Sequence, residues 1–197
     1  MFEVIYLTGA PAAGKSTTAK LLARRVSPLE VFEFGERLTA HLAAKGRRAI
    51  VQEDVRRWST GVVTPTDMRA VDRLLLEFAA EAWRRTHVVI DSYPVTKESF
   101  GFRITPYALD DSARLAPTQI WVLYADPETT VARIGRDTQG RLAITVVEAA
   151  LHTQLQASVA ATYGMSVGTP VYLFDTSRLS PEEAAAMLAG RLGRAAA

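Results

Sequence analysis

The sequence predicts an α/β protein with three layers, in which helices cover both faces of a five-stranded parallel sheet. The first observation is a set of five short β-branched or aromatic runs typical of buried strands, at residues 2–8, 29–34, 87–91, 118–124 and 170–174. The second is that stretches of helical periodicity separate these runs, at 15–26, 66–85, 145–163 and from 180 onward. Strands that alternate with helices form parallel sheets, whose ligands gather at the carboxyl ends of the strands.

The helices are recognised by their periodicity and by their end signals. In 66–85 the apolar residues recur at helical spacing, at Val71, Leu74, Leu75, Phe78 and Ala82. The last helix begins at Ser180, which can cap it, with Pro181 in the first turn and Glu183 completing a capping box. These signals set the order of elements along the chain.

Length and composition limit the class of protein. The 197 residues suit a single domain, 1–197, and the net charge is only +2. The chain has no cysteine, which excludes disulfides and thiolate catalysis and makes a reducing cytoplasm the expected location. No secretory leader is recognisable and no run approaches about 18 apolar residues, so we expect no membrane association.

A glycine-rich loop follows the first strand run and opens the first helix. Residues 9–16, GAPAAGKS, match G-x-x-x-x-G-K-[ST] at every fixed position. The glycines let successive backbone N–H groups point at phosphate oxygens, Lys15 is expected to reach the β- and γ-phosphates, and Ser16 is expected to hold Mg²⁺. The residues expected to contact the nucleotide here are Gly9, Ala12, Ala13, Gly14, Lys15, Ser16 and Thr17. The sequence therefore predicts a P-loop NTPase that binds ATP or GTP with Mg²⁺.

A carboxylate ends the third strand run. VVID at 88–91 places Asp91 at the carboxyl end of a strand in the same sheet as the loop. Its expected role is a contact with a water molecule of Mg²⁺ or with the acceptor of the phosphoryl group. The alternative is that Asp91 caps a turn, since DSYP at 91–94 is turn-like.

Further segments carry a resemblance to a known family over nearly the whole chain. They are VFEFGERL at 31–38, EDVRRW at 53–58, VVIDSYPVTKESFGF at 88–102, ARIGRDTQGR at 132–141 and AATYG at 160–164. Together with the P-loop, they resemble the archaeal-type adenylate kinases, a branch of the nucleoside monophosphate kinases. The resemblance implies ATP- and Mg²⁺-dependent phosphoryl transfer to a nucleoside monophosphate, with closure of a short lid, and it allows a homo-oligomer.

The resemblance also implies where the donor side of the site lies. The lid would span 133–145, and its closure would keep water from accepting the phosphoryl group. Three lid arginines would clamp the phosphoryl group in transfer: Arg133, Arg136 and Arg141. The adenine would lie between the lid and the loop after the fifth strand, where Asp175 and Ser177 are the candidate contacts.

The acceptor side is implied to lie in the segment 35–86, which would form a helical acceptor-binding insertion. The candidate residues in this segment and after the third strand are Gly35, Glu36, Arg37, Asp54, Arg56, Arg57, Tyr93, Lys97 and Phe102. Arg56 matches the acceptor-phosphate arginine of the family, with Arg57 beside it. This side also departs from the family pattern, because Glu36 stands where Thr is usual and Tyr93 replaces a polar residue.

The chemistry of the acceptor leaves two alternatives. A monophosphate is an anionic nucleophile that needs cations around it. The candidate cations are Arg37, Arg56, Arg57, Lys97 and Arg103. A hydroxyl of a sugar, nucleoside, antibiotic or nucleic acid instead needs a carboxylate near its proton, and the candidates are Glu36, Glu53, Asp54 and Asp91. We expect a nucleoside monophosphate kinase with a nucleotide as its small-molecule acceptor, and a hydroxyl kinase is the alternative.

Two other classes of function, a regulatory ATPase and a nucleic-acid-binding protein, fit the sequence less well. A regulatory ATPase is a third hypothesis, against which the arginines of the implied lid argue, because they lie in the same chain. Nucleic acid is not expected as the main partner, since no basic stripe is interleaved with aromatic residues. His41, His87 and His152 share no metal-ligand spacing, so we expect structural roles for them.

Overall fold

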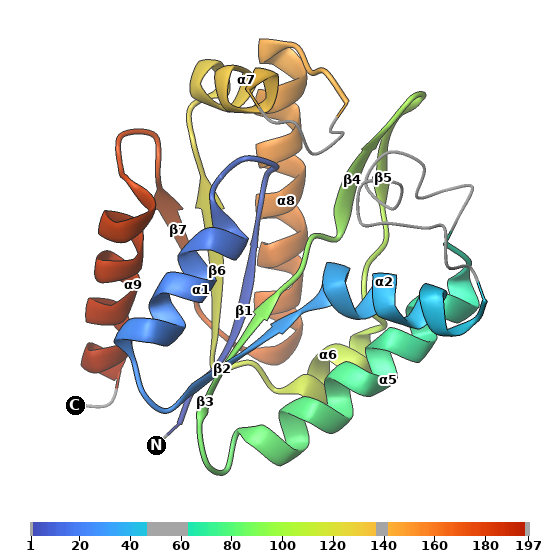
Figure 1. The fold of residues 1–197 in the computed structure, drawn as a ribbon, viewed down its shortest axis with the longest axis vertical. Coiled ribbons are helices and arrows are strands. Elements are labelled where there is room, and N and C mark those ends of the chain that lie inside the picture. The colour runs from blue at the N-terminus through green and yellow to red at the C-terminus, as the bar shows by residue number, and fades with distance from the viewer. Residues whose placement is uncertain (1, 47–62, 137–141, 196–197) are drawn as a thin grey trace.

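The computed structural model describes residues 2–46, 63–136 and 142–195 of the chain (Figure 1). Its centre is a five-stranded sheet in the order β2-β3-β1-β6-β7, in which every neighbouring pair is parallel. The strands are β1 (Val4–Gly9), β2 (Leu29–Glu33), β3 (His87–Asp91), β6 (Gln119–Tyr124) and β7 (Val171–Asp175). The structure confirms the predicted three-layer α/β/α fold, and each strand lies within two residues of its predicted bounds.

Helices lie against both faces of the sheet (Figure 1). One face is covered by α1 (Lys15–Arg25) and α9 (Pro181–Ala195). The other is covered by α2 (Phe34–Ala44), α5 (Pro65–Ala82), α6 (Leu109–Leu115) and α8 (Val146–Val167). The remaining helix, α7 (Pro127–Gly135), follows β6 beyond its carboxyl end.

The side chains of strand β1 are buried on both faces of the sheet, which explains why the strand sequences are continuous apolar runs. Ile5 and Leu7 pack in the cluster with α1 and α9, whereas Val4 and Tyr6 pack in the cluster with α2, α5 and α8. Successive side chains of a strand point to opposite faces, and here both faces are buried. The layers therefore meet at the strand that leads into the glycine-rich loop.

The predicted cap of the last helix is present. The backbone N–H of Ser180 donates to Glu183 Oε2 at 2.8 Å, and the N–H of Glu183 donates to Ser180 Oγ at 3.2 Å. Two further capping boxes begin α5 at Thr64 and α8 at Thr145. Each satisfies backbone donors that the first turn of a helix leaves unpaired.

A hairpin that the sequence did not predict follows β3. Its strands, β4 (Val95–Glu98) and β5 (Gly101–Ile104), pair antiparallel. Leu74, one of the apolar residues at helical spacing, is 45% exposed, because the buried face of α5 runs through Val71, Leu75 and Ala79. Among the described residues, no helix is long and apolar enough to cross a membrane.

Gly164 in α8 tests how closely this helix packs on the sheet. A Cβ there would lie 2.5 Å from Val171 Cγ2 and 2.8 Å from the carbonyl oxygen of Thr169. We expect Gly164→Ala to lower the free energy of unfolding, measured in urea, by about 1–3 kcal/mol. The control is Gly190→Ala in α9, where a Cβ meets nothing within 4 Å, and stability should rise by about 0.5–1 kcal/mol. Equal effects of the two substitutions would contradict this packing.

Candidate functional site

The glycine-rich loop connects the carboxyl end of β1 to the first residue of α1. Gly9 has φ +149°, and a Cβ there would lie 2.0 Å from the carbonyl oxygen of Leu123 on β6. Gly14 has φ +84° and caps α1 in the left-handed conformation. Lys15 Nζ donates to the carbonyl oxygen of Gly9 at 3.0 Å, so its ammonium is held over the loop. A loop of this shape at a helix N-terminus suits a phosphate group.

Ser16 and Asp91 meet where two neighbouring strands end. Leu7 of β1 is in register with Asp91 of β3, and Ser16 Oγ donates to Asp91 Oδ2 at 2.5 Å. Asp91 is 4% exposed, and its Oδ1 is buried without a hydrogen-bond partner among the described residues. A hydroxyl and a carboxylate with an unused oxygen fit Mg²⁺, which takes few protein ligands and completes its shell with phosphate oxygens and water. The described residues gather no group of three His, Cys, Asp or Glu side chains that could hold a metal by themselves.

Arg133 ties the end of α7 to the loops around the glycine-rich loop. Its guanidinium donates to the carbonyl oxygens of Ala12 at 3.3 Å and Thr176 at 2.9 Å. Arg136, at the C-terminal cap of α7, is exposed. The third predicted lid arginine, Arg141, lies outside the described residues. Their predicted role in clamping a phosphoryl group stays a prediction.

The loop after β7 is shaped by its own hydrogen bonds. Asp175 Oδ1 accepts from the backbone N–H of Ser177 at 2.8 Å and from its hydroxyl at 2.5 Å, and these bonds lower the pKa of Asp175. Ser177 Oγ in turn accepts from the N–H of Asp126 at 2.8 Å, which joins this loop to the start of α7. Thr176 Oγ1 donates to the carbonyl oxygen of Ala13 at 3.2 Å, so this loop lies beside the glycine-rich loop. The adenine contacts of Asp175 and Ser177 stay a prediction.

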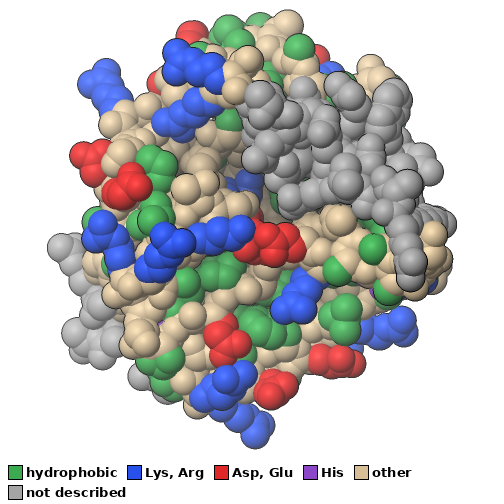
Figure 2. Space-filling model, viewed as in Figure 1, with side chains coloured by type: hydrophobic (Ala, Val, Ile, Leu, Met, Phe, Trp, Pro, Cys, Tyr) green, Lys and Arg blue, Asp and Glu red, His purple; other side chains and the backbone are tan. Residues whose placement is uncertain are grey.

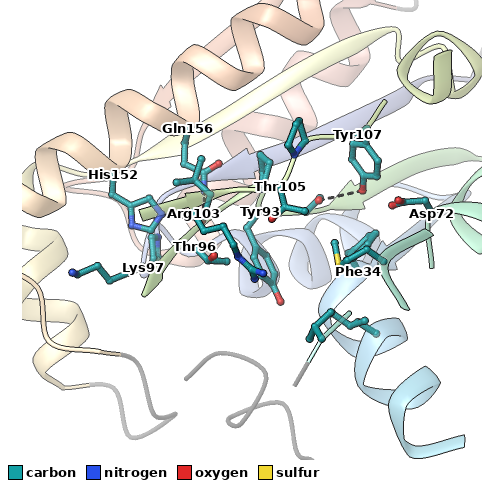
Figure 3. Close-up of a pocket in the computed structure, with 18 of the residues that line it drawn as sticks. Phe34, Asp72, Tyr93, Thr96, Lys97, Arg103, Thr105, Tyr107, His152 and Gln156 are labelled. Atoms are coloured by element: carbon teal, nitrogen blue, oxygen red, sulfur yellow. Dashed lines mark hydrogen bonds between the residues drawn. The ribbon is translucent and has the colours of Figure 1, made fainter. Parts of the chain in front are cut away.

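A cavity of about 590 Å³ opens beside Lys15 and Ser16 (Figure 3). It is enclosed by α2, α5, the β4–β5 hairpin and α8. Most of its lining is apolar or aromatic, with Phe34, Leu38, Val63, Met68, Tyr93, Pro94, Tyr107, Ile134, Leu142 and Ile144 among the contributors. Its charged lining residues, besides Lys15, are Arg69, Asp72, Lys97, Arg103 and Asp111. A pocket of this size and lining suits a small molecule.

Three of the predicted acceptor residues line this cavity: Tyr93, Lys97 and Arg103. The ring centroid of Tyr93 lies 5.9 Å from Lys15 Nζ. Lys97 Nζ lies 3.0 Å from Glu148 Oε1 and 5.4 Å from the ring centroid of Phe102. The Lys97 ammonium is therefore already neutralised by a carboxylate.

The other predicted acceptor residues that the structure describes do not line the cavity. Gly35 is buried inside α2, and Glu36 points outward to Lys20 Nζ at 3.2 Å. Arg37 covers the ring of Phe32 at 5.5 Å. Phe102 packs on the ring of His152 in a small core beside α7 and α8. Asp54, Arg56 and Arg57 lie outside the described residues.

Several cavity residues were missed because they come from distant elements. Phe34, Asp72, Tyr107 and Gln156 lie in α2, α5, the segment before α6, and α8. The sequence offered one signal for these residues: Asp72 is acidic and directly follows Val71, a residue of the apolar face of the predicted helix. His152, expected to be structural, lines the cavity, and its Nε2 contacts the carbonyl oxygen of Val95 at 3.0 Å. Burial lowers the pKa of His152 to about 4, so its ring is neutral near pH 7.

Asp72 is a second residue of the cavity whose pKa departs from its usual value. Its Oδ1 is buried and has no hydrogen-bond partner among the described residues. Burial, with a smaller contribution from the charge of Asp111, raises the pKa of Asp72 to about 6. Desolvation disfavours the charged form of an acid.

Comparison with known proteins identifies the family. The chain belongs to the AAA domain family, which it matches over residues 8–149. No curated protein matches the sequence. The family and the architecture together define a P-loop kinase fold, and they support the predicted ATP-dependent kinase.

Solved structures with the same fold include three proteins of similar length. A tunicamycin resistance protein from Deinococcus radiodurans is 17% identical, with a TM-score of 0.58 over 98% of this chain and 96% of that chain. A shikimate kinase from Bacteroides thetaiotaomicron is 18% identical, with a TM-score of 0.56 over 97% and 98%. A sugar kinase from Janibacter sp. is 17% identical, with a TM-score of 0.51 over 100% and 99%. At these identities the likeness shows the shared fold.

The raised pKa of Asp72 predicts a pH-dependent gain in stability for Asp72→Asn. Between about pH 4 and 6 the folded state binds more protons at this carboxyl than the unfolded state, so stability falls as pH rises and stays lower above pH 6. Removing the charge should therefore raise Tm at about pH 8 more than at about pH 4. The control is Glu77→Gln on the exposed face of α5, which should show no such difference. Thermal unfolding of both variants measures this, and a gain independent of pH would contradict the buried charge.

Proposed function

We propose that the protein is an ATP- and Mg²⁺-dependent kinase that phosphorylates a hydroxyl group of a small, partly apolar molecule. The observation that carries the proposal is the largely apolar cavity beside Lys15 and Ser16. It adjoins the place where a P-loop holds the γ-phosphate. An acceptor in the cavity would lie next to the phosphoryl group.

The charges around the cavity favour a hydroxyl over a monophosphate. A monophosphate brings negative charge that must be met by cations close to the transferring group. Lys97 faces Glu148 at 3.0 Å, and Arg103 faces the buried carboxylate of Glu98 at 3.4 Å. These two cations are matched by carboxylates, whereas a neutral hydroxyl needs no extra cation.

The residues at the ends of β1 and β3 supply the chemistry. The loop N–H groups and Lys15 would hold the phosphates of ATP, and Mg²⁺, which neutralises phosphate charge when bound, fits Ser16 and Asp91. In transfer, the acceptor oxygen bonds to the γ-phosphorus, the bond from that phosphorus to ADP breaks, and the hydroxyl proton leaves to a base. Asp91 Oδ1 is the candidate base, because it is buried and accepts no hydrogen bond from a described residue.

The lid is part of the same proposal. Residues 133–145 would close over the phosphates and exclude water. The contacts of Arg133 with Ala12 and Thr176 support a position beside the donor site, and Arg136 and Arg141 would contribute charge to the transferring group.

A second candidate is a nucleoside monophosphate kinase, which the sequence resemblance favours. Its specific support is the segment EDVRRW at 53–58, with Arg56 and Arg57 as cations for an acceptor phosphate. The segment lies outside the described residues. Sugars and shikimate, named for two structures of this fold, carry hydroxyl groups and fit the first candidate. The cytoplasmic location and a homo-oligomer stay predictions.

An acceptor screen separates these functions. Purified protein with ATP and Mg²⁺ would be offered sugars, nucleosides and hydroxyl-bearing antibiotics in one panel, and ribo- and deoxynucleoside monophosphates in another. Mass spectrometry should find a phosphate monoester from the first panel and no nucleoside diphosphate from the second. Diphosphates without any monoester would establish the second candidate, and ATP turnover that ignores both panels would indicate a regulatory ATPase.

Lys15→Ala tests the donor site under either candidate. We expect kcat to fall by about 100- to 1,000-fold, because one charge contact to the transition state is lost. The matched control is Lys20→Ala on the same helix, since Lys20 is half-exposed and its ammonium contacts the carboxylates of Glu33 at 3.1 Å and Glu36 at 3.2 Å. Steady-state kinetics with circular dichroism would check both variants. Full activity in folded Lys15→Ala protein would overturn the donor site.

A further inference from the structure

We propose that the acceptor is an amino alcohol, whose protonated amine binds Asp72 on the side of the cavity across from His152 and Lys97. The inference rests on the proposed function, because it assigns the substrate class of the same cavity. It goes beyond that function by naming a second recognition point that the transfer of the phosphoryl group does not itself require.

Asp72 lies across the cavity from His152 and Lys97. Figure 3 shows Asp72 on one side, near Phe34 and Tyr107, and His152 with Lys97 on the other. Lys15 and Asp72 both line the cavity, and most of the other lining residues are apolar or aromatic. A molecule that contacts both Lys15 and Asp72 would therefore lie along a largely apolar wall.

One oxygen of the half-buried Asp72 carboxylate has no hydrogen-bond partner among the described residues. This oxygen, Oδ1, is itself buried. Arg69, on the same helix, also lines the cavity, but it is largely exposed and its guanidinium donates to Thr66 Oγ1 at 3.3 Å. An unpaired carboxylate out of water costs folding free energy, which a bound cation would offset.

A cation fits this end of the cavity better than a neutral donor. Asp111 on α6 also lines the cavity and adds negative charge, and its contact with Arg114 at 3.7 Å is on the surface. Aromatic side chains stand beside Asp72: the rings of Phe34 and Tyr107 lie 6.1 Å apart, and both line the cavity. Aromatic rings together with a carboxylate form the environment that binds ammonium groups. Because the pKa of Asp72 is about 6, its carboxyl group is mostly ionised near pH 7 and can bind a cation.

The recognised molecule also needs a polar group along its length. Ser92 Oγ and the hydroxyl of Tyr107 lie 3.3 Å apart and both line the cavity. This pair can donate to or accept from hydroxyl groups of the acceptor. The proposed substrate is therefore a molecule with an amine at one end, a hydroxyl group at the other and an apolar part between them.

Matched pairs of small molecules test the inference without requiring turnover. The probes are 4-(aminomethyl)benzyl alcohol with 1,4-benzenedimethanol, 6-amino-1-hexanol with 1,6-hexanediol, and phenylethanolamine with styrene glycol, each pair differing in an amine against a hydroxyl. Thermal shift and calorimetry would be measured with a non-hydrolysable ATP analogue and Mg²⁺ present. We expect the amine of at least one pair to bind more tightly than its hydroxyl partner, and Asp72→Asn to weaken that amine about ten-fold or more.

Two controls make the outcome decisive. Glu77→Gln, an exposed carboxylate on the same helix, should keep the preference for the amine. Asp72→Asn should keep the thermal shift given by the ATP analogue, which shows that it is folded. No preference for an amine in any pair, or a preference that survives Asp72→Asn, would overturn the inference.

The same molecules separate this inference from the proposed function. If amines bind through Asp72 but none is phosphorylated, the amine site stands and the hydroxyl-kinase proposal fails. If neutral hydroxyl compounds are phosphorylated with no preference for amines, the hydroxyl-kinase proposal stands and the role of Asp72 fails.

Discussion

The hydrogen bond from Ser16 Oγ to Asp91 Oδ2 is the contact on which the candidate site depends. It can form because β1 and β3 are adjacent and parallel, with Leu7 in register with Asp91, so that the first turn of α1 meets the end of β3. The chain after Asp91 then continues into the β4–β5 hairpin, which forms one wall of the cavity. The glycine-rich loop and the cavity therefore lie at the same edge of the sheet, beyond the carboxyl ends of β1 and β3, which is where open parallel sheets place their ligands.

Unpaired buried carboxylate oxygens connect stability with function in this molecule. In the part of the chain that the structure describes, Asp72 Oδ1 and Asp91 Oδ1 are the carboxylate oxygens that are buried without a hydrogen-bond partner. Such groups lower stability unless something binds them. Asp91 lies at the proposed magnesium and base position and Asp72 in the lining of the cavity, so both stand where a ligand would satisfy them. The apolar lining between them makes each charge more effective, because it keeps water away.

The sequence was most informative where a signal is local. The strands follow from apolar runs that are buried on both faces, the glycine-rich loop follows from its fixed spacing, and Asp91 follows from its place after a strand. The cavity could not be predicted in the same way, because Phe34, Asp72 and Tyr107 come from separate elements that meet only in the folded chain. The resemblance made Glu36 a candidate contact for the acceptor. In the structure α2 buries the face that carries Phe34, Leu38 and Leu42, so Glu36 lies on another face of the helix and points outward. The hairpin was missed because its four-residue strands carry little apolar periodicity.

The role of the Ser16–Asp91 contact is tested most directly by the effect of Mg²⁺ on ATP affinity. Titration calorimetry would compare ATP binding with and without Mg²⁺ in the wild-type protein and in Asp91→Asn. We expect Mg²⁺ to tighten ATP binding in the wild type, and we expect Asp91→Asn to lose most of this gain while its metal-free affinity is unchanged, because Asn lacks the negative charge that favours the metal. An equal gain from Mg²⁺ in both proteins would contradict a site organised around this contact.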